Sequence, residues 1–382
     1  MRIALALPTY WPEVRRGTER LVHDLSVALV ARGHDVTILT THPGRTTVSD
    51  EEGVRVIRDR RLPDLRRLRF YEDHVATIPS FLARLAQGRF DLVHAFFPPQ
   101  AWAAIRAKRF GGPPVVFSYH GIPGRAYLVK RRYRLEMLKQ AFEDADVASV
   151  LSRVAADEAR RLLQVDPVVL PGGVFASEFS AGSGRTEAPS VICAASLWDR
   201  RKRADVLFEA WEQVADRMGE ATLRVVRPRD LLSVPGAGMP PGAEYSTERI
   251  ELADGGELEL PRQAVWVDAD ATAQLARAYA SSWVSVLPAV NEAFGLVLIE
   301  SLAAGTPVVA ARSGACQEII TDERVGRLFE PDDPGALTQS LLDAFELAKD
   351  PGVTGACRAR AEEFDWARVV RTYEASYQAA VG

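Results

Sequence analysis

Cysteine is scarce in this chain, with three residues among 382. Cys193, Cys316 and Cys357 lie far apart and are odd in number, so they show neither a disulfide framework nor the paired spacing of a zinc site. Disulfides persist in secreted proteins and are rare in the cytosol. The cysteine content therefore indicates a reducing compartment, and we expect a cytoplasmic protein.

Long apolar runs and an excess of positive charge are also missing. No stretch approaches the roughly 20 apolar residues of a transmembrane helix, and the run Ile3 to Leu7 is too short for the core of a signal peptide. Any membrane contact would be peripheral, and we do not favour one. The formal net charge is -4, whereas a dedicated nucleic-acid binder is usually basic. We therefore expect no nucleic-acid partner.

What the chain has instead is an alternation of short apolar runs and amphipathic segments. Glu19 to Arg32 carries apolar residues at helical spacing and is followed by Gly33, as at many helix ends. Short, nearly all-apolar runs are typical of buried parallel strands. This alternation predicts an α/β fold with parallel sheets covered on both faces. In the first half, strands are expected at 2–7, 35–40, 54–57, 92–94, 115–119, 147–152 and 168–170.

The same rhythm restarts after a break, as expected for about two domains in a chain of this length. Pro171 to Arg185 is rich in Gly, Ser and Ala without periodicity, which indicates a linker. Ile250 to Leu260 alternates on both sides of Asp254-Gly255-Gly256, a hairpin signature. Further strands are expected at 191–195, 223–226, 265–267, 283–287 and 307–310, and helices at 204–218 and 366–380.

The most informative segment runs from Glu292 to Glu300, directly after an expected strand. A carboxylate at a strand end can accept hydrogen bonds from sugar hydroxyls. On a helix, eight positions at about 100° each leave an offset of only about 80°, so both carboxylates would share one side. The amides of Phe294, Gly295 and Leu296 would lie at a helix N-terminus, which favours phosphate. The segment therefore suits a nucleotide-sugar.

Several further motifs follow one another along the chain. They are Arg16-Gly17-Thr18-Glu19, Gly33-His34-Asp35-Val36, Asp91-Leu92-Val93-His94, Ser118-Tyr119-His120-Gly121, Ala145-Asp146-Val147, Leu170-Pro171-Gly172-Gly173-Val174, the Glu292–Glu300 segment, Ala304-Gly305-Thr306-Pro307-Val308-Val309 and Gly314-Ala315-Cys316-Gln317-Glu318. In this order they resemble the GT-B glycosyltransferases, specifically the retaining glycosyltransferase family 4, over almost the whole length.

The resemblance implies two Rossmann-like domains with the active site in the cleft between them. Residues 1–172 would form the acceptor domain, and the C-terminal helix 366–382 would cross back onto it. Residues 173–365 would form the nucleotide-sugar domain. The family transfers sugar with retention, usually described as front-face attack in which the departing phosphate accepts the acceptor's proton. No protein nucleophile, metal or other cofactor is expected.

The resemblance also implies roles for single residues. Glu292 would contact the sugar hydroxyls, Glu300 the ribose, and His120 the sugar near the reacting carbon, while the Gly17 amide would approach the diphosphate. We group His120, Glu292 and Lys202 as catalytic. Donor-binding candidates are Gly17, Thr18, Arg201, Lys202, Phe294, Gly295, Leu296, Val297 and Glu300, and acceptor-binding candidates are Arg16, Phe96, Phe97 and Tyr119.

Three departures from the family pattern leave questions open. The family often has an Arg where this chain has Ser196, and Arg200-Arg201-Lys202-Arg203 crowds the position of the family Lys. We assign that role to Lys202, with Arg201 replacing the missing Arg, although some of the run must face solvent. Arg227-Pro228-Arg229-Asp230 replaces a Gly-containing turn, which leaves the nucleobase open. Phe96 replaces a second histidine. The run Phe96-Phe97-Pro98-Pro99 could line the acceptor site or belong to the core.

Weaker motifs have plainer explanations. Asp144-Ala145-Asp146 and Asp268-Ala269-Asp270 resemble a metal-binding D-x-D, but Asp268 and Asp270 precede a helix and suit helix caps. Gly236-Ala237-Gly238 lacks the rest of a dinucleotide fingerprint. The basic segments 58–69 and 130–134 could touch anionic lipid or a phosphorylated acceptor, and solvated helix faces explain them better.

Taken together, these features predict a hexosyltransferase-type enzyme that uses a nucleoside-diphosphate sugar, UDP- first and GDP- next. A small metabolite or natural-product intermediate is the expected acceptor. The alternatives are a lipid or polysaccharide-precursor transferase, or a GT-B protein that is not a transferase, such as an epimerase, a pseudo-transferase or a nucleotide-binding partner. The sugar, the linkage, the acceptor and a homodimer stay open.

Overall fold

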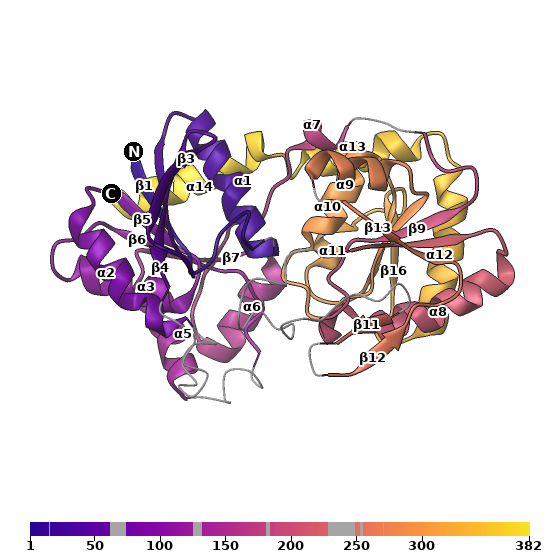
Figure 1. The fold of residues 1–382 in the computed structure, drawn as a ribbon, viewed down its shortest axis with the longest axis horizontal. Helices are drawn as coiled ribbons and strands as arrows, with labels where there is room; N and C mark the ends of the chain where they lie inside the picture. The colour runs from indigo at the N-terminus through magenta and orange to yellow at the C-terminus, as the bar shows by residue number, and fades with distance from the viewer. Residues whose placement is uncertain are drawn as a thin grey trace. The chain divides into compact units, whose positions relative to one another are not determined.

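The computed structural model describes residues 1–14, 16–61, 74–124, 132–180, 184–227, 249–252, 255–269 and 271–382. The chain divides into two compact units. Unit 1 comprises Met1–Gly173 and Trp366–Gly382, and unit 2 comprises Val174–Asp365. The C-terminal helix α14 (Trp366–Val381) thus packs with the first part of the chain. Figure 1 shows the elements of each unit.

Unit 1 is built on one sheet with the strand order β3-β4-β2-β1-β5-β6-β7-β8. Its pairs are parallel except for the edge strand β3, which runs antiparallel to β4. The chain leaves β1 toward β2 on one side and returns to β5 on the other, so ligands are expected at the carboxyl edge near this point. The strands are β1 (Arg2–Ala6), β2 (Asp35–His42), β3 (Thr47–Glu51), β4 (Val54–Arg60), β5 (Leu92–Ala95), β6 (Val115–Tyr119), β7 (Val147–Val150) and β8 (Val168–Val169).

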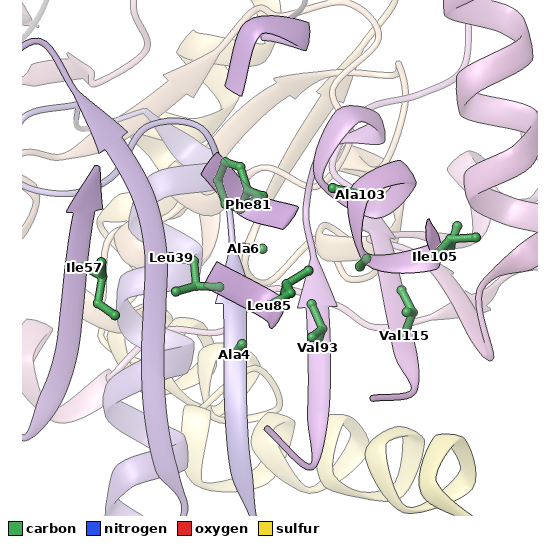
Figure 2. Packing of buried hydrophobic residues seen from close by; sticks show 11 residues of the cluster. Ala4, Ala6, Leu39, Ile57, Phe81, Leu85, Val93, Ala103, Ile105 and Val115 are labelled. Atoms are coloured by element: carbon green, nitrogen blue, oxygen red, sulfur yellow. The ribbon is translucent and has the colours of Figure 1, made fainter. Parts of the chain in front are cut away.

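Helices cover both faces of this sheet. The apolar residues of α2 (Ile78–Gln87) and α3 (Pro98–Lys108) meet those of five strands on one face, as Figure 2 shows for Phe81, Leu85 and Val93. The crossover through α1 (Gly17–Ala31) runs in the opposite direction, so right-handedness places it on the other face, where α14 packs against it. The unit also contains η2 (Val75–Thr77), α5 (Arg132–Asp144) and α6 (Arg153–Leu163).

Unit 2 is built on a six-stranded sheet with the order β13-β10-β9-β14-β15-β16, and all its pairs are parallel. The strands are β9 (Ser190–Cys193), β10 (Thr222–Val226), β13 (Ala264–Val267), β14 (Val284–Leu287), β15 (Val308–Ala311) and β16 (Gly326–Phe329). The helices are α7 (Ala176–Phe179), η3 (Arg200–Lys202), α8 (Ala204–Arg217), α9 (Thr272–Ala280), α10 (Leu296–Ala304), α11 (Cys316–Ile319), α12 (Pro334–Ala348) and α13 (Val353–Glu362).

Most expected strands and helices are confirmed within one to three residues. The hairpin is confirmed by β11 (Arg249–Glu251) and β12 (Glu257–Glu259), which pair antiparallel, while the turn residue Asp254 lies outside the described residues. Strands β3 and β16 were missed. The linker expected at 171–185 is wrong in part, because residues 176–179 form α7, which packs on α9, α10 and α13. The Ala176 amide also donates to Asp365 Oδ2 at 3.0 Å.

A buried polar network ties α14 to the sheet of unit 1. His94 contacts the Tyr377 hydroxyl through Nδ1 at 2.8 Å and the Ser118 hydroxyl through Nε2 at 2.7 Å. Ser118 in turn meets Ser149 at 2.5 Å. Burial, followed by the proximity of His120, lowers the pKa of His94 well below its usual value. His94 is therefore neutral at pH 7 and can donate through one nitrogen and accept through the other.

Tyr377→Phe is expected to lower the free energy of unfolding of unit 1 by about 1–3 kcal/mol, because it leaves a buried His94 nitrogen without its partner. Denaturant titration measures this. Ser118→Ala removes the other end of the same network, so the double variant should lose less than the sum of the single losses. Strictly additive losses would show that the two hydroxyls act independently.

Candidate functional site

Glu292 lies in the loop between β14 and α10, not on the helix. The helix begins at Leu296, and Gly295 stands before it as the N-cap with φ +100°. A left-handed backbone at that position redirects the chain, and glycine adopts it without strain. The expectation that Glu292 and Glu300 share one helix face is therefore wrong, because only Glu300 is on the helix.

Lys202 and Glu292 form an ion pair, with Nζ and Oε2 2.6 Å apart. Their side chains are 20% and 17% exposed, so the ion pair is largely buried but still accessible to a ligand. Burial alone would raise the pKa of the Glu292 carboxyl. The Lys202 charge and hydrogen bond, the Phe294 amide and the Arg201 charge outweigh that effect, and the pKa is lowered. Glu292 is therefore ionised at neutral pH.

Three loops at the carboxyl edge of unit 2 hold Glu292 in place. They follow β9, β14 and β15, which are neighbours in the sheet. The Val290 amide donates to the Arg201 carbonyl at 2.8 Å, and the Ala315 amide donates to the Glu292 carbonyl at 2.8 Å. The Asn291 amide donates to Ser313 Oγ at 3.0 Å. Backbone bonds from both sides therefore fix the carboxylate beside Lys202.

Gly314 lies close against the Glu292 backbone. It has φ +58°, and a Cβ built on it would lie 2.2 Å from the Glu292 carbonyl oxygen and 2.7 Å from its amide nitrogen. Both atoms belong to the main chain and cannot rotate away. Only glycine therefore allows the loop after β15 to lie so close to the loop that carries Glu292.

Glu300 lies within unit 2 on α10 and is buried. Its Oε2 accepts a hydrogen bond from the Tyr279 hydroxyl of α9 at 3.4 Å. The Phe294 amide, expected to face phosphate, is engaged with the Glu292 carboxylate, and the Phe294 ring packs edge-on against Phe364. Leu296 and Val297 open the first turn of α10. The roles of these residues toward ribose and diphosphate stay predictions.

The basic run separates into residues with different partners. Arg201 is 63% exposed and bonds Asp199 at 2.6 Å. Arg203 pairs with Asp205 at 2.9 Å and also with Asp332. Lys202 is the member that contacts Glu292. Lys202 is therefore the member of the run that lies beside Glu292, and its role toward the diphosphate stays a prediction. Arg201 would have to leave Asp199 to replace the family Arg.

In unit 1, the predicted glycine loop meets the start of α1. Gly17 is the first residue of this helix, Thr18 the second, and Arg16 the N-cap. Two hydrogen bonds to Glu19 in this region were not predicted from the sequence. Buried Glu19 accepts from the Thr9 hydroxyl at 2.6 Å and from Arg16 at 2.9 Å. An acidic residue in the first turn, one helical step from an Arg, was the available signal.

His120 follows β6 at its carboxyl end. Both ring nitrogens are buried and have no hydrogen-bond partner among the described residues. Burial lowers the pKa of His120 to about 3, so the imidazole is neutral at pH 7. Unpartnered buried nitrogens cost free energy, and a bound hydroxyl would satisfy one of them. His120 is therefore a candidate contact for a polar ligand.

His120 should make stability depend on pH. An unfolded histidine has a pKa near 6.5, whereas the folded pKa is about 3, so the unfolded chain binds the proton first. Stability should fall as pH drops from about 6.5 toward 3, by up to about 1.4 kcal/mol per pH unit. Denaturant titrations of His120→Gln should show a shallower fall than the wild type. His42→Gln is the control, and an equal change of slope in both variants would contradict this.

The aromatic acceptor-binding candidates of unit 1 differ in their burial and in their ring contacts. Phe96 is a core residue, with its ring 4.1 Å from that of His94 and 5.1 Å from that of His120 between centroids. It cannot stack directly on an acceptor here. Phe97 meets the His74 ring edge-on at 5.7 Å. Tyr119 is half-buried and lies edge-on to Phe142.

The weaker motifs are also placed. Asp144 and Asp146 pair with Arg109 and Lys108, at 3.1 and 2.5 Å. The N-cap of α9 is Ala271, so Asp268 does not cap it, and Asp270 lies outside the described residues. Within the described ranges, no group of three or more His, Cys, Asp and Glu residues is arranged to hold a metal. Of the basic segments 58–69 and 130–134, residues 62–69, 130 and 131 lie outside the described residues. The same holds for residues 228–230 of the turn that differs from the family and for the glycine motif at 236–238. The expectation of a solvated helix face is wrong for Arg58–Arg60, which belong to β4.

None of the helices in the described part of the chain is long and apolar enough to cross a membrane.

Comparisons with known proteins agree with this architecture. Residues 15–178 match Glycosyltransferase Family 4, and residues 188–346 match Glycosyl transferases group 1. The chain is 30% identical to a D-inositol 3-phosphate glycosyltransferase of Geodermatophilus obscurus, over 77% of this chain and 67% of the relative. Sucrose-phosphate synthase of Thermosynechococcus elongatus has a TM-score of 0.76 at 22% identity, covering 99% of this chain and 98% of that one.

A second solved structure is the Anabaena protein HepE in complex with UDP-glucose. It has a TM-score of 0.70 at 16% identity, and the match covers 99% of each chain. These two likenesses show the fold, and the GT-B architecture predicted from the sequence is confirmed. The sequence matches show the family. The chain belongs to glycosyltransferase family 4, the glycosyl transferases group 1, and is a glycosyltransferase.

Proposed function

We propose that this glycosyltransferase moves a sugar from a nucleoside-diphosphate sugar to a small acceptor with retention of anomeric configuration and without a metal. The observation that carries the proposal is the Lys202–Glu292 ion pair at the carboxyl edge of unit 2. A carboxylate can accept hydrogen bonds from sugar hydroxyls, and an ammonium can neutralise the leaving phosphate. The two groups therefore supply the two kinds of contact that a nucleotide-sugar needs.

In the proposed reaction, the acceptor oxygen forms a bond to the anomeric carbon while the bond from that carbon to the phosphate oxygen breaks. The acceptor's proton passes to the departing diphosphate, so no protein base is required. Lys202 stabilises the negative charge that develops on the leaving group. Glu292 orients the sugar, Glu300 binds the ribose, and neutral His120 exchanges hydrogen bonds with the sugar. The helix N-termini at Gly17 and Leu296 add amides for phosphate.

UDP is the first choice of nucleotide, and GDP the second. The neighbour HepE was solved with UDP-glucose, which supports the first. The relative named for D-inositol 3-phosphate supports a small polar acceptor. Relatives named phosphatidyl-myo-inositol mannosyltransferase support the lipid alternative. Calorimetry with UDP-, GDP- and ADP-glucose, and with UDP and GDP alone, would rank the bases.

The test is a transfer assay with the preferred donor and a panel of polyols, sugars and aglycones, in which NMR measures the anomeric configuration of the product. We expect a product with the donor's configuration and no loss of rate after treatment with EDTA. An inverted product would exclude retention, and a rate restored only by Mg²⁺ would exclude metal independence.

A second candidate is a GT-B protein that binds a nucleotide-sugar without transferring it. It is favoured by one observation, the replacement of the family Arg by Ser196 while Arg201 is bonded to Asp199. Tight binding of a donor, with neither hydrolysis nor transfer across the acceptor panel, would support it over the transferase.

A further inference from the structure

A corner at the carboxyl edge of the unit 1 sheet comprises Arg16, Arg61 and His74. The Lys202–Glu292 pair, by contrast, belongs to unit 2. Arg16 precedes α1 in the connection from β1, Arg61 directly follows β4, and His74 precedes η2. Strands β4, β2 and β1 are adjacent in the sheet. Two segments distant in sequence therefore bring guanidinium groups to one edge, and His74 lies close enough for both charges to affect it.

Thr41, at the end of β2, connects this corner. Arg61 donates from Nε to Thr41 Oγ1 at 3.1 Å and from its terminal nitrogen to the Thr41 carbonyl at 2.8 Å. Thr41 Oγ1 donates in turn to the Pro8 carbonyl at 2.7 Å, at the start of the loop that leads to Arg16. Arg61 is 5% exposed. These bonds hold its guanidinium in a fixed position.

Arg16 is held from the other side of the corner. Its guanidinium donates to buried Glu19 at 2.9 Å and to Thr9 at 3.4 Å, yet the side chain remains 35% exposed. Glu19 therefore orients Arg16 without covering it, which leaves donors for a ligand because a guanidinium carries five N–H groups.

His74 lies within the electrostatic influence of both arginines of this corner. Its pKa is lowered to about 3, first by burial and then by the charges of Arg16 and Arg61. Both guanidinium groups therefore act on one point, and the imidazole there is neutral at pH 7. A neutral imidazole can donate a hydrogen bond to an oxyanion without adding charge of its own.

We propose that Arg16 and Arg61, with His74, bind a phosphate group of a substrate. Arginine suits this group because its planar donors match phosphate oxygens in pairs. The inference rests on the proposed transferase function for the identity of the substrate. The phosphate belongs either to a phosphorylated acceptor or to the diphosphate of the donor, and the experiment below separates the two.

The proposal is tested by measuring the binding of inorganic phosphate to the full-length chain by ³¹P NMR, with and without saturating UDP. Arg61→Gln and Arg16→Gln should each raise the phosphate Kd about tenfold or more, since each removes charge-assisted hydrogen bonds. Arg84→Gln is the matched control: Arg84 is another partly buried Arg of unit 1, paired with Asp59. Circular dichroism checks folding, and the more exposed Arg16 variant decides the outcome if the Arg61 variant does not fold.

Each result of the phosphate-binding experiment has a distinct interpretation. Phosphate binding that survives UDP and is weakened by the two substitutions assigns the corner to a phosphorylated acceptor. Binding that is weakened by the substitutions but abolished by UDP assigns it to the donor diphosphate. Absent binding, or equal binding in the arginine variants and the Arg84 control, overturns the proposal. A failure of the transferase function would appear separately, as a lack of donor turnover with phosphate binding intact.

Discussion

Glu292→Gln is expected to lower kcat/KM for sugar transfer about 10- to 100-fold. The amide keeps the size of the side chain but replaces a charge-assisted hydrogen bond, worth about 1.5–3 kcal/mol, with a neutral one. It also leaves Lys202 without the carboxylate that lies 2.6 Å from its Nζ. Steady-state kinetics with the preferred donor measure the loss, and UDP binding should change less, since UDP lacks the sugar.

Glu323→Gln is the matched control, because it makes the same chemical change at an exposed position of unit 2. It should leave kcat/KM within about twofold, as surface substitutions are usually neutral. Unchanged transfer by Glu292→Gln would remove Glu292 from the sugar site. A Glu292→Gln loss that appears equally in UDP affinity would instead point to a general disturbance of the three loops.

Gly314→Ala is expected to destabilise unit 2 by about 2–5 kcal/mol and to reduce transfer with it. The new Cβ would lie 2.2 Å from the Glu292 carbonyl oxygen, at φ +58°. Left-handed backbone in a non-glycine residue costs about 1–2 kcal/mol, and overpacking adds about 1–3 kcal/mol. Relief of the contact must move the loop that holds Glu292. Denaturant titration and kinetics measure the two effects.

Gly355→Ala provides the opposite case within the same unit. Gly355 lies inside α13, and an added Cβ meets nothing within 4 Å. Alanine there should raise stability by about 0.5–1 kcal/mol, because glycine weakens a helix interior. If Gly314→Ala were as stable and as active as this control, the close approach would have no role in fixing Glu292.

Apolar runs predicted the strands well, because a buried parallel strand must be apolar on both faces. The two missed strands lack that pattern. β3 is polar and pairs only along one edge. β16 begins with a glycine and an arginine, which interrupt its apolar run. The linker was misplaced because α7 is also short, and what stabilises it is packing against α9, α10 and α13, which composition does not reveal.

The site was predicted less completely than the fold. Glu292 and Lys202 were named from motifs, but their 2.6 Å contact spans 90 positions and depends on how three loops meet. The His94 network was missed for the same reason, since it joins residues from different elements. The Arg16–Glu19 contact is local, three positions apart, and only Thr9 joins it from the loop after β1. Phe96 could have been a surface or a core residue on sequence alone, and packing beside His94 decided it.

By itself, the sequence determined the fold class, the family and the residue types offered to a donor, because these follow from local patterns of apolar, acidic and glycine residues. Only the tertiary structure decided which charges meet. Helix α10 begins only after the left-handed Gly295, so Glu292 lies in the preceding loop. Lys202, rather than its arginine neighbours, pairs with that carboxylate. The tertiary structure also gathered Arg16, Arg61 and His74 at one sheet edge. Electrostatic energy depends on distance in space and on burial, and neither can be read from spacing along the chain.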